Sequence, residues 1–137
     1  MKSKMKVYIM GPKQLAAKGA IPFYENIVAF TKNYFGKVVC TYPDFWDSKR
    51  SPRSHYNFMK SVIKSCDYLI AEVSTPATGL GIELEMAVTY KIPVIALVRE
   101  GQKASHLALG VPVLRRIITY KDQKDLNPKL ARAFAAL

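Results

Sequence analysis

The sequence of 137 residues has few cysteines, few acidic residues and no long apolar run. Its two cysteines, Cys40 and Cys66, lack the spacing of a metal site or a redox motif, so buried free thiols are expected. No apolar run approaches the roughly 18 residues of a membrane span. The first apolar run follows a basic start and stops at Gly11, which is too short for a secretory signal. A cytoplasmic protein without a membrane partner is therefore expected.

Acidic residues are outnumbered, because 21 Lys and Arg stand against 10 Asp and Glu, a formal net charge of +11. Such a charge favours anionic ligands. The basic residues are scattered, and neither a zinc finger nor an aromatic RNA-binding signature accompanies them. His55 and His106 have no partner at the spacing of a metal site or a catalytic triad. A small anion the size of a nucleotide is therefore a better candidate than nucleic acid, and no metal is expected.

Short apolar runs alternate with helical patterns along a chain that has the length of a single domain, 1–137. Strands are expected at 6–10, 38–41, 68–73, 93–98 and 114–119. Helices are expected at 20–35, 56–66, 82–90 and 127–136, and the polar stretch 49–54 is expected to be a loop. The alternation predicts an α/β fold with helices on both faces of a parallel sheet. We expect a flavodoxin-like three-layer sandwich with five strands in the order 2-1-3-4-5.

In that order the carboxyl ends of the first and third strands lie side by side, where open α/β sheets bind ligands. Gly11 and Lys13 would face the same cleft as residues 75–81. Gly79 and Gly81 are expected where the backbone turns from strand to helix. They can expose amide donors to an anion or a sugar hydroxyl, although a turn without a ligand would use the same residues.

Glu83 is expected in the first turn of the helix after the third strand. A carboxylate there can act as a nucleophile or a general base, or can simply stabilise the helix N-terminus. Glu85 lies about 200° round the helix and faces elsewhere. Tyr8 either hydrogen-bonds the Glu83 carboxylate or packs in the core. Phe45 and Trp46 either sandwich a planar base or close an edge of the core.

The segments VYIMG (7–11), CDYLIAEV (66–73) and GLGIEL (79–84) together resemble the nucleoside 2-deoxyribosyltransferase family. The resemblance runs from about residue 6 to residue 120 and is greatest to its 2′-deoxynucleoside 5′-phosphate N-hydrolases. It implies a flavodoxin-like fold and cleavage of an N-glycosidic bond, with no cofactor. Glu83 aligns with the glutamate that attacks C1′ of the sugar to form a covalent intermediate. Tyr8 aligns with the tyrosine that holds this carboxylate.

Ser105 resembles a family serine that reaches the phosphate of substrate bound by the neighbouring subunit. This resemblance implies a homodimer with shared sites. The family also has a serine two residues before its first glycine, where this chain has Ala77, and Thr78 beside it offers a hydroxyl instead.

Two other family positions differ in this chain. The serine and arginine that follow the first strand are replaced by Pro12 and Gln14, and an aspartate that helps the base to leave is replaced by Met59. Three basic residues are candidates to bind the phosphate in place of the arginine, and two acids are candidates to assist the leaving base in place of the aspartate. The first group is Lys13, Arg53 and Arg99, and the second is Asp44 and Asp47.

These observations predict an N-glycosidase that acts on a nucleoside or a (deoxy)nucleoside 5′-monophosphate. The substrate-binding residues would be Gly11, Lys13, Asp44, Phe45, Trp46, Thr78, Gly79, Gly81 and Ser105, with Glu83 and Tyr8 as catalytic residues. A deoxyribosyltransferase that exchanges bases and a non-catalytic nucleotide sensor are the alternatives. The sequence leaves open which base is released and whether the sugar is ribose or 2′-deoxyribose.

Overall fold

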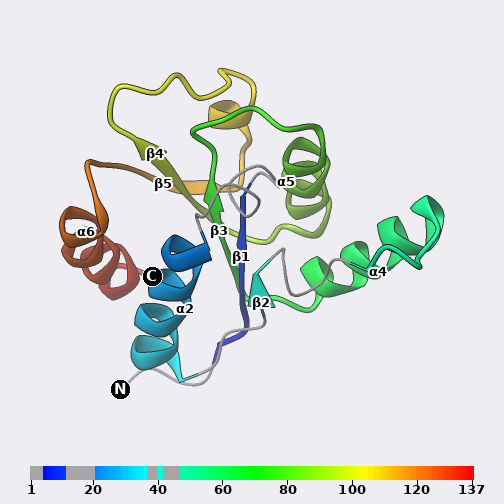
Figure 1. Ribbon diagram of the computed structural model, residues 1–137, viewed down its shortest axis with the longest axis horizontal. Coiled ribbons are helices and arrows are strands. Elements are labelled where there is room, and N and C mark those ends of the chain that lie inside the picture. The colour runs from blue at the N-terminus through cyan, green and yellow to red at the C-terminus, as the bar shows by residue number, and fades with distance from the viewer. Residues whose placement is uncertain (1–4, 12–20, 37–39, 42–46) are drawn as a thin grey trace.

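The computed structural model describes residues 5–11, 21–36, 40–41 and 47–137. Within them, a parallel sheet lies between two layers of helices (Figure 1). Its strands are β1 (Val7–Met10), β2 (Cys40–Thr41), β3 (Tyr68–Glu72), β4 (Val94–Arg99) and β5 (Leu114–Tyr120), in the order β2-β1-β3-β4-β5. Every neighbouring pair is parallel. The expected α/β class with a parallel sheet is confirmed.

Among the described residues, two helices cover each face of the sheet. Helices α4 (Pro52–Lys64) and α5 (Thr78–Tyr90) pack on one face, and α2 (Ile21–Phe35) and α6 (Gln123–Ala135) pack on the other. The β4–β5 connection carries a short 3₁₀ helix, η1 (Ala108–Gly110). No helix was expected from the sequence in this connection.

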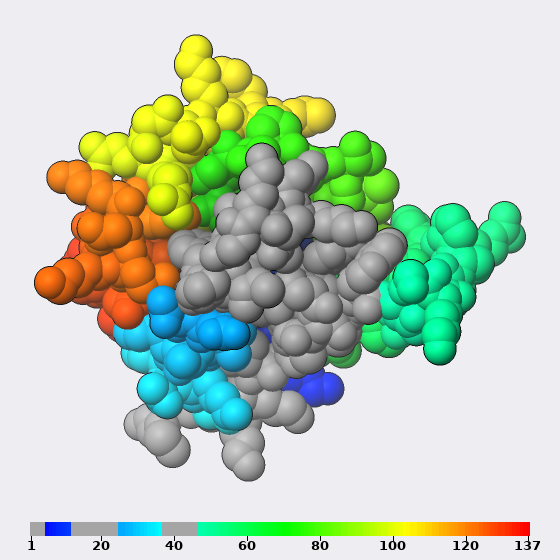
Figure 2. All heavy atoms as spheres, viewed as in Figure 1, coloured from blue at the N-terminus to red at the C-terminus, as the bar shows by residue number. Residues whose placement is uncertain are grey.

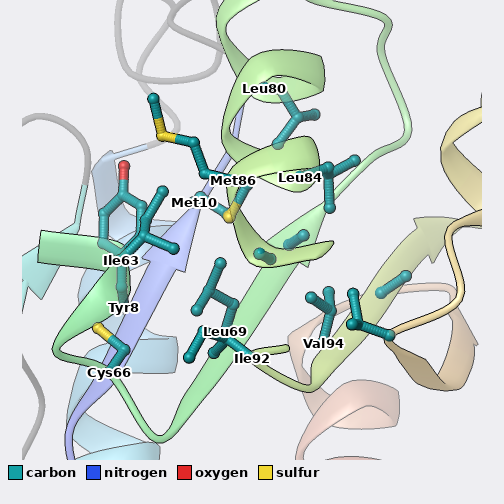
Figure 3. Close-up of a cluster of buried hydrophobic side chains, with 14 of the residues drawn as sticks. Tyr8, Met10, Ile63, Cys66, Leu69, Leu80, Leu84, Met86, Ile92 and Val94 are labelled. Carbon is teal, nitrogen blue, oxygen red and sulfur yellow. The ribbon is translucent and has the colours of Figure 1, made fainter. Parts of the chain in front are cut away.

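The side chains of β1 show how the two layers share the core. Tyr8 and Met10 belong to the cluster under α4 and α5, whereas Val7 and Ile9 belong to the cluster under α2 and α6. Tyr8 pairs with Leu69 of β3, and Figure 3 shows Tyr8 and Met10 below Leu80 of α5. Both faces of each central strand are buried, and this is why these strands are almost continuously apolar.

Helix α4 begins earlier than expected, and the expected loop at 49–54 is wrong from Pro52 onward. The Ser51 hydroxyl caps the helix by accepting a hydrogen bond from the Ser54 amide at 3.2 Å. Proline suits the first helical position because its missing N–H has no partner there. The Ser-Pro pair was the signal for this helix start.

Helix α5 also begins earlier, at Thr78, so Glu83 lies in its second turn and the expected first-turn position is wrong. Gly79 and Gly81 are helical, and neither has a positive φ. The expectation that they form the turn from strand to helix is therefore wrong, because that turn lies before Thr78.

Helix α6 begins at Gln123 instead of residue 127, with Asp122 as its cap. Cys66 is buried as expected, and burial raises the pKa of its thiol to about 11, so the thiol is protonated at neutral pH. The side chain of Cys40 lies outside the described residues. No helix in the described part of the chain is long and apolar enough to cross a membrane.

Candidate active site

A cavity of about 670 Å³ opens at the carboxyl ends of β1 and β3, beside the first turns of α5. It lies at the edge of the sheet where the sequence predicted a cleft. Six of the expected site residues line it: Gly11, Thr78, Gly79, Gly81, Glu83 and Ser105. The β4–β5 connection, which is yellow at the top of Figure 2, supplies another part of the wall. Leu107, Ala108 and Val111 line the cavity there together with Ser105.

The start of α5 gives the cavity a polar wall. Ala77 precedes the helix, and its methyl group makes no capping hydrogen bond to the first helical amides, which can therefore donate to a ligand in the cavity. A Cβ atom added to Gly79 or Gly81 would meet no described atom within 4 Å. Packing therefore does not require glycine at these two positions. Their effect is to keep the wall of the cavity free of side chains.

Glu83 lines this cavity with a carboxyl group that is only 7% exposed. Burial raises the pKa of Glu83 to about 7, and hydrogen bonding with Tyr8 acts in the opposite direction and lowers it. The Oε2 atom of Glu83 is buried and has no hydrogen-bond partner among the described residues. The site therefore holds a buried carboxyl group with one oxygen left for a ligand.

Tyr8 combines the two roles considered from the sequence. Its ring is fully buried in the core under α5, and its hydroxyl acts on the Glu83 carboxyl group. In Figure 3 the Tyr8 hydroxyl points along β1 toward the carboxyl end of the sheet. Tyr8 does not itself line the cavity, so it contacts the carboxylate from the core side.

Ser105 lies in the β4–β5 connection at the start of the turn that leads to η1. Its Oγ atom accepts a hydrogen bond from the Ala108 amide at 3.3 Å, so its hydroxyl proton remains available to a ligand. Leu107 beside it is 85% exposed although it lines the cavity. The sequence drew attention to Ser105 only through the family resemblance, and it gave no signal for the wall formed by Leu107 and Val111.

Four expected substrate-binding residues lie outside the described residues: Lys13, Asp44, Phe45 and Trp46. Of the proposed replacements that are described, none lines the cavity. Arg99 stacks its guanidinium 5.6 Å from the Tyr120 ring, and Asp47 accepts a hydrogen bond from the Lys49 amide at 2.9 Å.

The described lining contains no Lys or Arg, despite the net charge of +11. Met59 is buried in the core under α4 and α5, where an apolar side chain fits and an aspartate would not. No group of His, Cys, Asp and Glu suited to a metal ion occurs in the part of the chain that the structure describes.

Three curated proteins are similar to this chain. A stretch of 82 residues is 35% identical to a Methanosarcina mazei protein provisionally named 2′-deoxynucleoside 5′-phosphate N-hydrolase 1, covering 59% of this chain and 51% of the relative. A Methanosarcina barkeri protein of the same name is 43% identical over 80 residues, which cover 58% of this chain and 50% of the relative. A third, from Syntrophotalea carbinolica, is 29% identical over 119 residues and 82% of each chain.

The expected resemblance to 2′-deoxynucleoside 5′-phosphate N-hydrolases is confirmed by these relatives. The names of these N-hydrolase relatives denote enzymes that act on glycosyl bonds. The chain spans about half the length of the two Methanosarcina relatives that it matches. No family model matches the chain.

Solved structures share the fold. A CMP N-glycosidase from Clostridium botulinum has a TM-score of 0.70 at 21% identity, covering 93% of this chain and 98% of its own. A conserved protein from Enterococcus faecalis V583 has a TM-score of 0.74 at 15% identity, and the match covers 95% of this chain and 99% of that protein. A 2-deoxyribosyltransferase from Leishmania mexicana has a TM-score of 0.54 at 22% identity, and the match covers 69% of this chain and 64% of that protein.

Proposed function

We propose that this protein is an N-glycosidase that cleaves the base–sugar bond of a (deoxy)nucleoside 5′-monophosphate, with Glu83 as the nucleophile. The observation that carries the proposal is the buried Glu83 carboxyl group, which lines a cavity of about 670 Å³ and whose Oε2 atom has no hydrogen-bond partner among the described residues. That volume lies within the range of about 300–1,000 Å³ typical of small-molecule sites. The names of the N-hydrolase relatives support the substrate class.

In the first step, an ionised Glu83 oxygen attacks C1′ of the sugar. The bond between C1′ and the base nitrogen breaks, and the base leaves with the electron pair and takes a proton from water. Positive charge on the sugar ring in the transition state is stabilised by the nearby carboxylate. In the second step, water hydrolyses the glycosyl ester, which releases the sugar phosphate and restores the carboxylate.

Ionisation of Glu83 controls the first step. With its pKa at about 7, only part of the protein holds the reactive carboxylate at neutral pH. Turnover is therefore expected to rise with pH through that range. The hydrogen bond with Tyr8 lowers the pKa of Glu83 and so increases the reactive fraction.

We also propose a homodimer in which Ser105 reaches the phosphate of substrate in the neighbouring subunit. The family resemblance supports both the assembly and the contact between subunits. The Ser105 hydroxyl accepts a hydrogen bond from the Ala108 amide, so its proton can still be donated to a phosphate. Light scattering of the purified protein tests the assembly. Ser105→Ala should raise the KM for a 5′-monophosphate more than the KM for the matching nucleoside.

A non-catalytic nucleotide sensor is the second candidate. The observation in its favour is that Met59 is buried in the core where the family has an aspartate that helps the base to leave. A sensor would gain thermal stability from a nucleotide without consuming it. A transferase would instead convert substrate and a second free base into the exchanged nucleotide.

The experiment is to incubate the protein with ribo- and deoxyribonucleosides and their 5′-monophosphates, with and without a second base, and to follow free base by chromatography. Glu83→Gln should lower turnover by several orders of magnitude because the nucleophile is lost. Glu85→Gln is the matched control, since Glu85 is exposed on the same helix and outside the cavity. Equal turnover by wild type and Glu83→Gln would exclude the proposed role of Glu83.

A further inference from the structure

A second buried carboxylate lies on the other face of the sheet. Glu72 ends β3 and is only 2% exposed. Its Oε1 atom accepts a hydrogen bond from the Ser74 amide at 2.6 Å, and its Oε2 atom accepts one from the Tyr120 hydroxyl. Both carboxylate oxygens therefore have donors, which is the requirement for keeping such a group inside a protein.

Further hydrogen bonds of Ser74 and Tyr120 connect the ends of β3, β4 and β5. The Ser74 Oγ atom accepts a hydrogen bond from the Arg99 amide at the end of β4, at 2.6 Å. The Tyr120 carbonyl at the end of β5 accepts one from the Glu100 amide at 2.8 Å. Burial and then the nearby Glu72 carboxylate raise the pKa of Tyr120 far above its usual value, so its hydroxyl remains a donor. We call Glu72, Ser74 and Tyr120 the strand-end clamp.

The strand-end clamp adjoins the candidate active site through the backbone. Val73 and Thr75, on either side of Ser74, both line the cavity. The chain continues along the cavity through Pro76 and Ala77 to the start of α5, which carries Glu83. Ser74 is thus an anchor point within the wall that connects β3 to the helix of the proposed nucleophile.

We propose that Glu72 is a positioning residue: by holding Ser74 against the ends of β4 and β5, it keeps the 73–77 wall in place and excludes water from Glu83. Glu72 itself does not line the cavity, so it acts through Ser74. Its effect on turnover rests on the proposed function, whereas its effect on the burial of Glu83 does not.

The pKa of Glu83 is a direct reporter of this effect. Burial is the main cause that raises this pKa to about 7. The titratable neighbour that also affects it is Tyr8, whose hydrogen bond lowers it. If the 73–77 wall loosens, water reaches the carboxyl group and its pKa falls toward the ordinary value of 4.5. A change that only lowers global stability leaves this pKa unchanged in the folded protein.

The experiment is a ¹³C NMR titration of the Glu carboxyl carbons, with Glu83→Gln to assign the Glu83 signal. Glu72→Leu removes both acceptors, and Tyr120→Phe removes one donor with almost no change in shape. Each should lower the pKa of Glu83 by about one pH unit. Glu72→Gln keeps the acceptor for Ser74 and should stay close to wild type. Tyr34→Phe, on α2, is the matched control and should have no effect.

An unchanged Glu83 pKa in folded Glu72→Leu and Tyr120→Phe would overturn the proposal. If Glu72→Leu does not fold, Tyr120→Phe decides the question alone. Where wild type releases base, both variants should also lower kcat by about tenfold or more at pH 9, where Glu83 is ionised in wild type and variants alike, and Glu72→Gln should restore it. A shifted pKa in a protein without activity would support the clamp and contradict the proposed function, so the two failures remain distinguishable.

Discussion

Replacing Glu83 by Gln should stabilise the protein at alkaline pH while it abolishes turnover. The folded protein raises the pKa of Glu83 from 4.5 to about 7, so ionising this group costs more in the folded state than in the unfolded chain. Below pH 4.5 the group is protonated in both states. Between pH 4.5 and about 7 the unfolded chain loses this proton while the folded protein keeps it, so the stability of the wild type falls across this range. Glutamine is neutral throughout, so the variant shows no such fall.

The magnitude follows from the size of the pKa difference. At about 1.4 kcal/mol per pH unit, a rise from 4.5 to about 7 corresponds to about 3 kcal/mol. The gain in unfolding free energy of Glu83→Gln over wild type should therefore be about 3 kcal/mol larger at pH 8 than at pH 4. Any packing difference between the two side chains contributes at both pH values and cancels in this comparison.

Urea unfolding of both proteins at pH 4 and pH 8, followed by circular dichroism, measures this difference. Glu85→Gln is the control because Glu85 is exposed on the same helix, and its stability relative to wild type should change little with pH. A Glu83→Gln variant whose advantage over wild type is the same at both pH values would refute the reasoning. Burial would then not disfavour ionisation of the Glu83 carboxyl group.

Three further outcomes are expected. Gly81→Ala should raise the free energy of unfolding by about 1 kcal/mol, because alanine favours a helix, yet raise KM, because its methyl group enters the cavity. Gly36→Ala, at φ +81°, is the contrasting control and should lower stability in the same urea assay. Tyr8→Phe should raise the pKa of Glu83 and move the acidic limb of the pH–rate profile upward, and an unmoved limb would contradict their hydrogen bond. The Oδ1 atom of Asp122 caps α6 by accepting a hydrogen bond from the Asp125 amide at 2.9 Å. Asp122→Ala should therefore lower the free energy of unfolding by about 1 kcal/mol, which calorimetry measures.

The alternation of apolar runs and helical patterns was enough to predict the α/β class, the parallel sheet and the edge that holds the cavity. Helix starts were less accurate, because caps such as Ser51 and Asp122 lie several residues before the first apolar position. The same error placed Glu83 in the first turn of α5. Its importance was still recognised, because its position in the GLGIEL segment does not depend on where the helix begins.

Other features depend on contacts that sequence patterns do not contain. Glu72 is followed by an apolar residue within the segment AEV, and nothing local indicates that its partner is Tyr120, 48 residues away. The wall of the β4–β5 connection likewise arises from how the chain crosses the end of the sheet. The scattered basic residues suggested a cationic site, yet the described lining of the cavity contains none.

Trapping the glycosyl ester tests the central claim most directly. The protein is mixed with the 5′-monophosphate that it cleaves, quenched with acid at short times, and examined by intact mass spectrometry and peptide mapping. We expect a mass increase equal to the sugar phosphate on the peptide that contains Glu83, and none in Glu83→Gln. Base release by wild type with no adduct, and at the same rate by Glu83→Gln, would contradict the account.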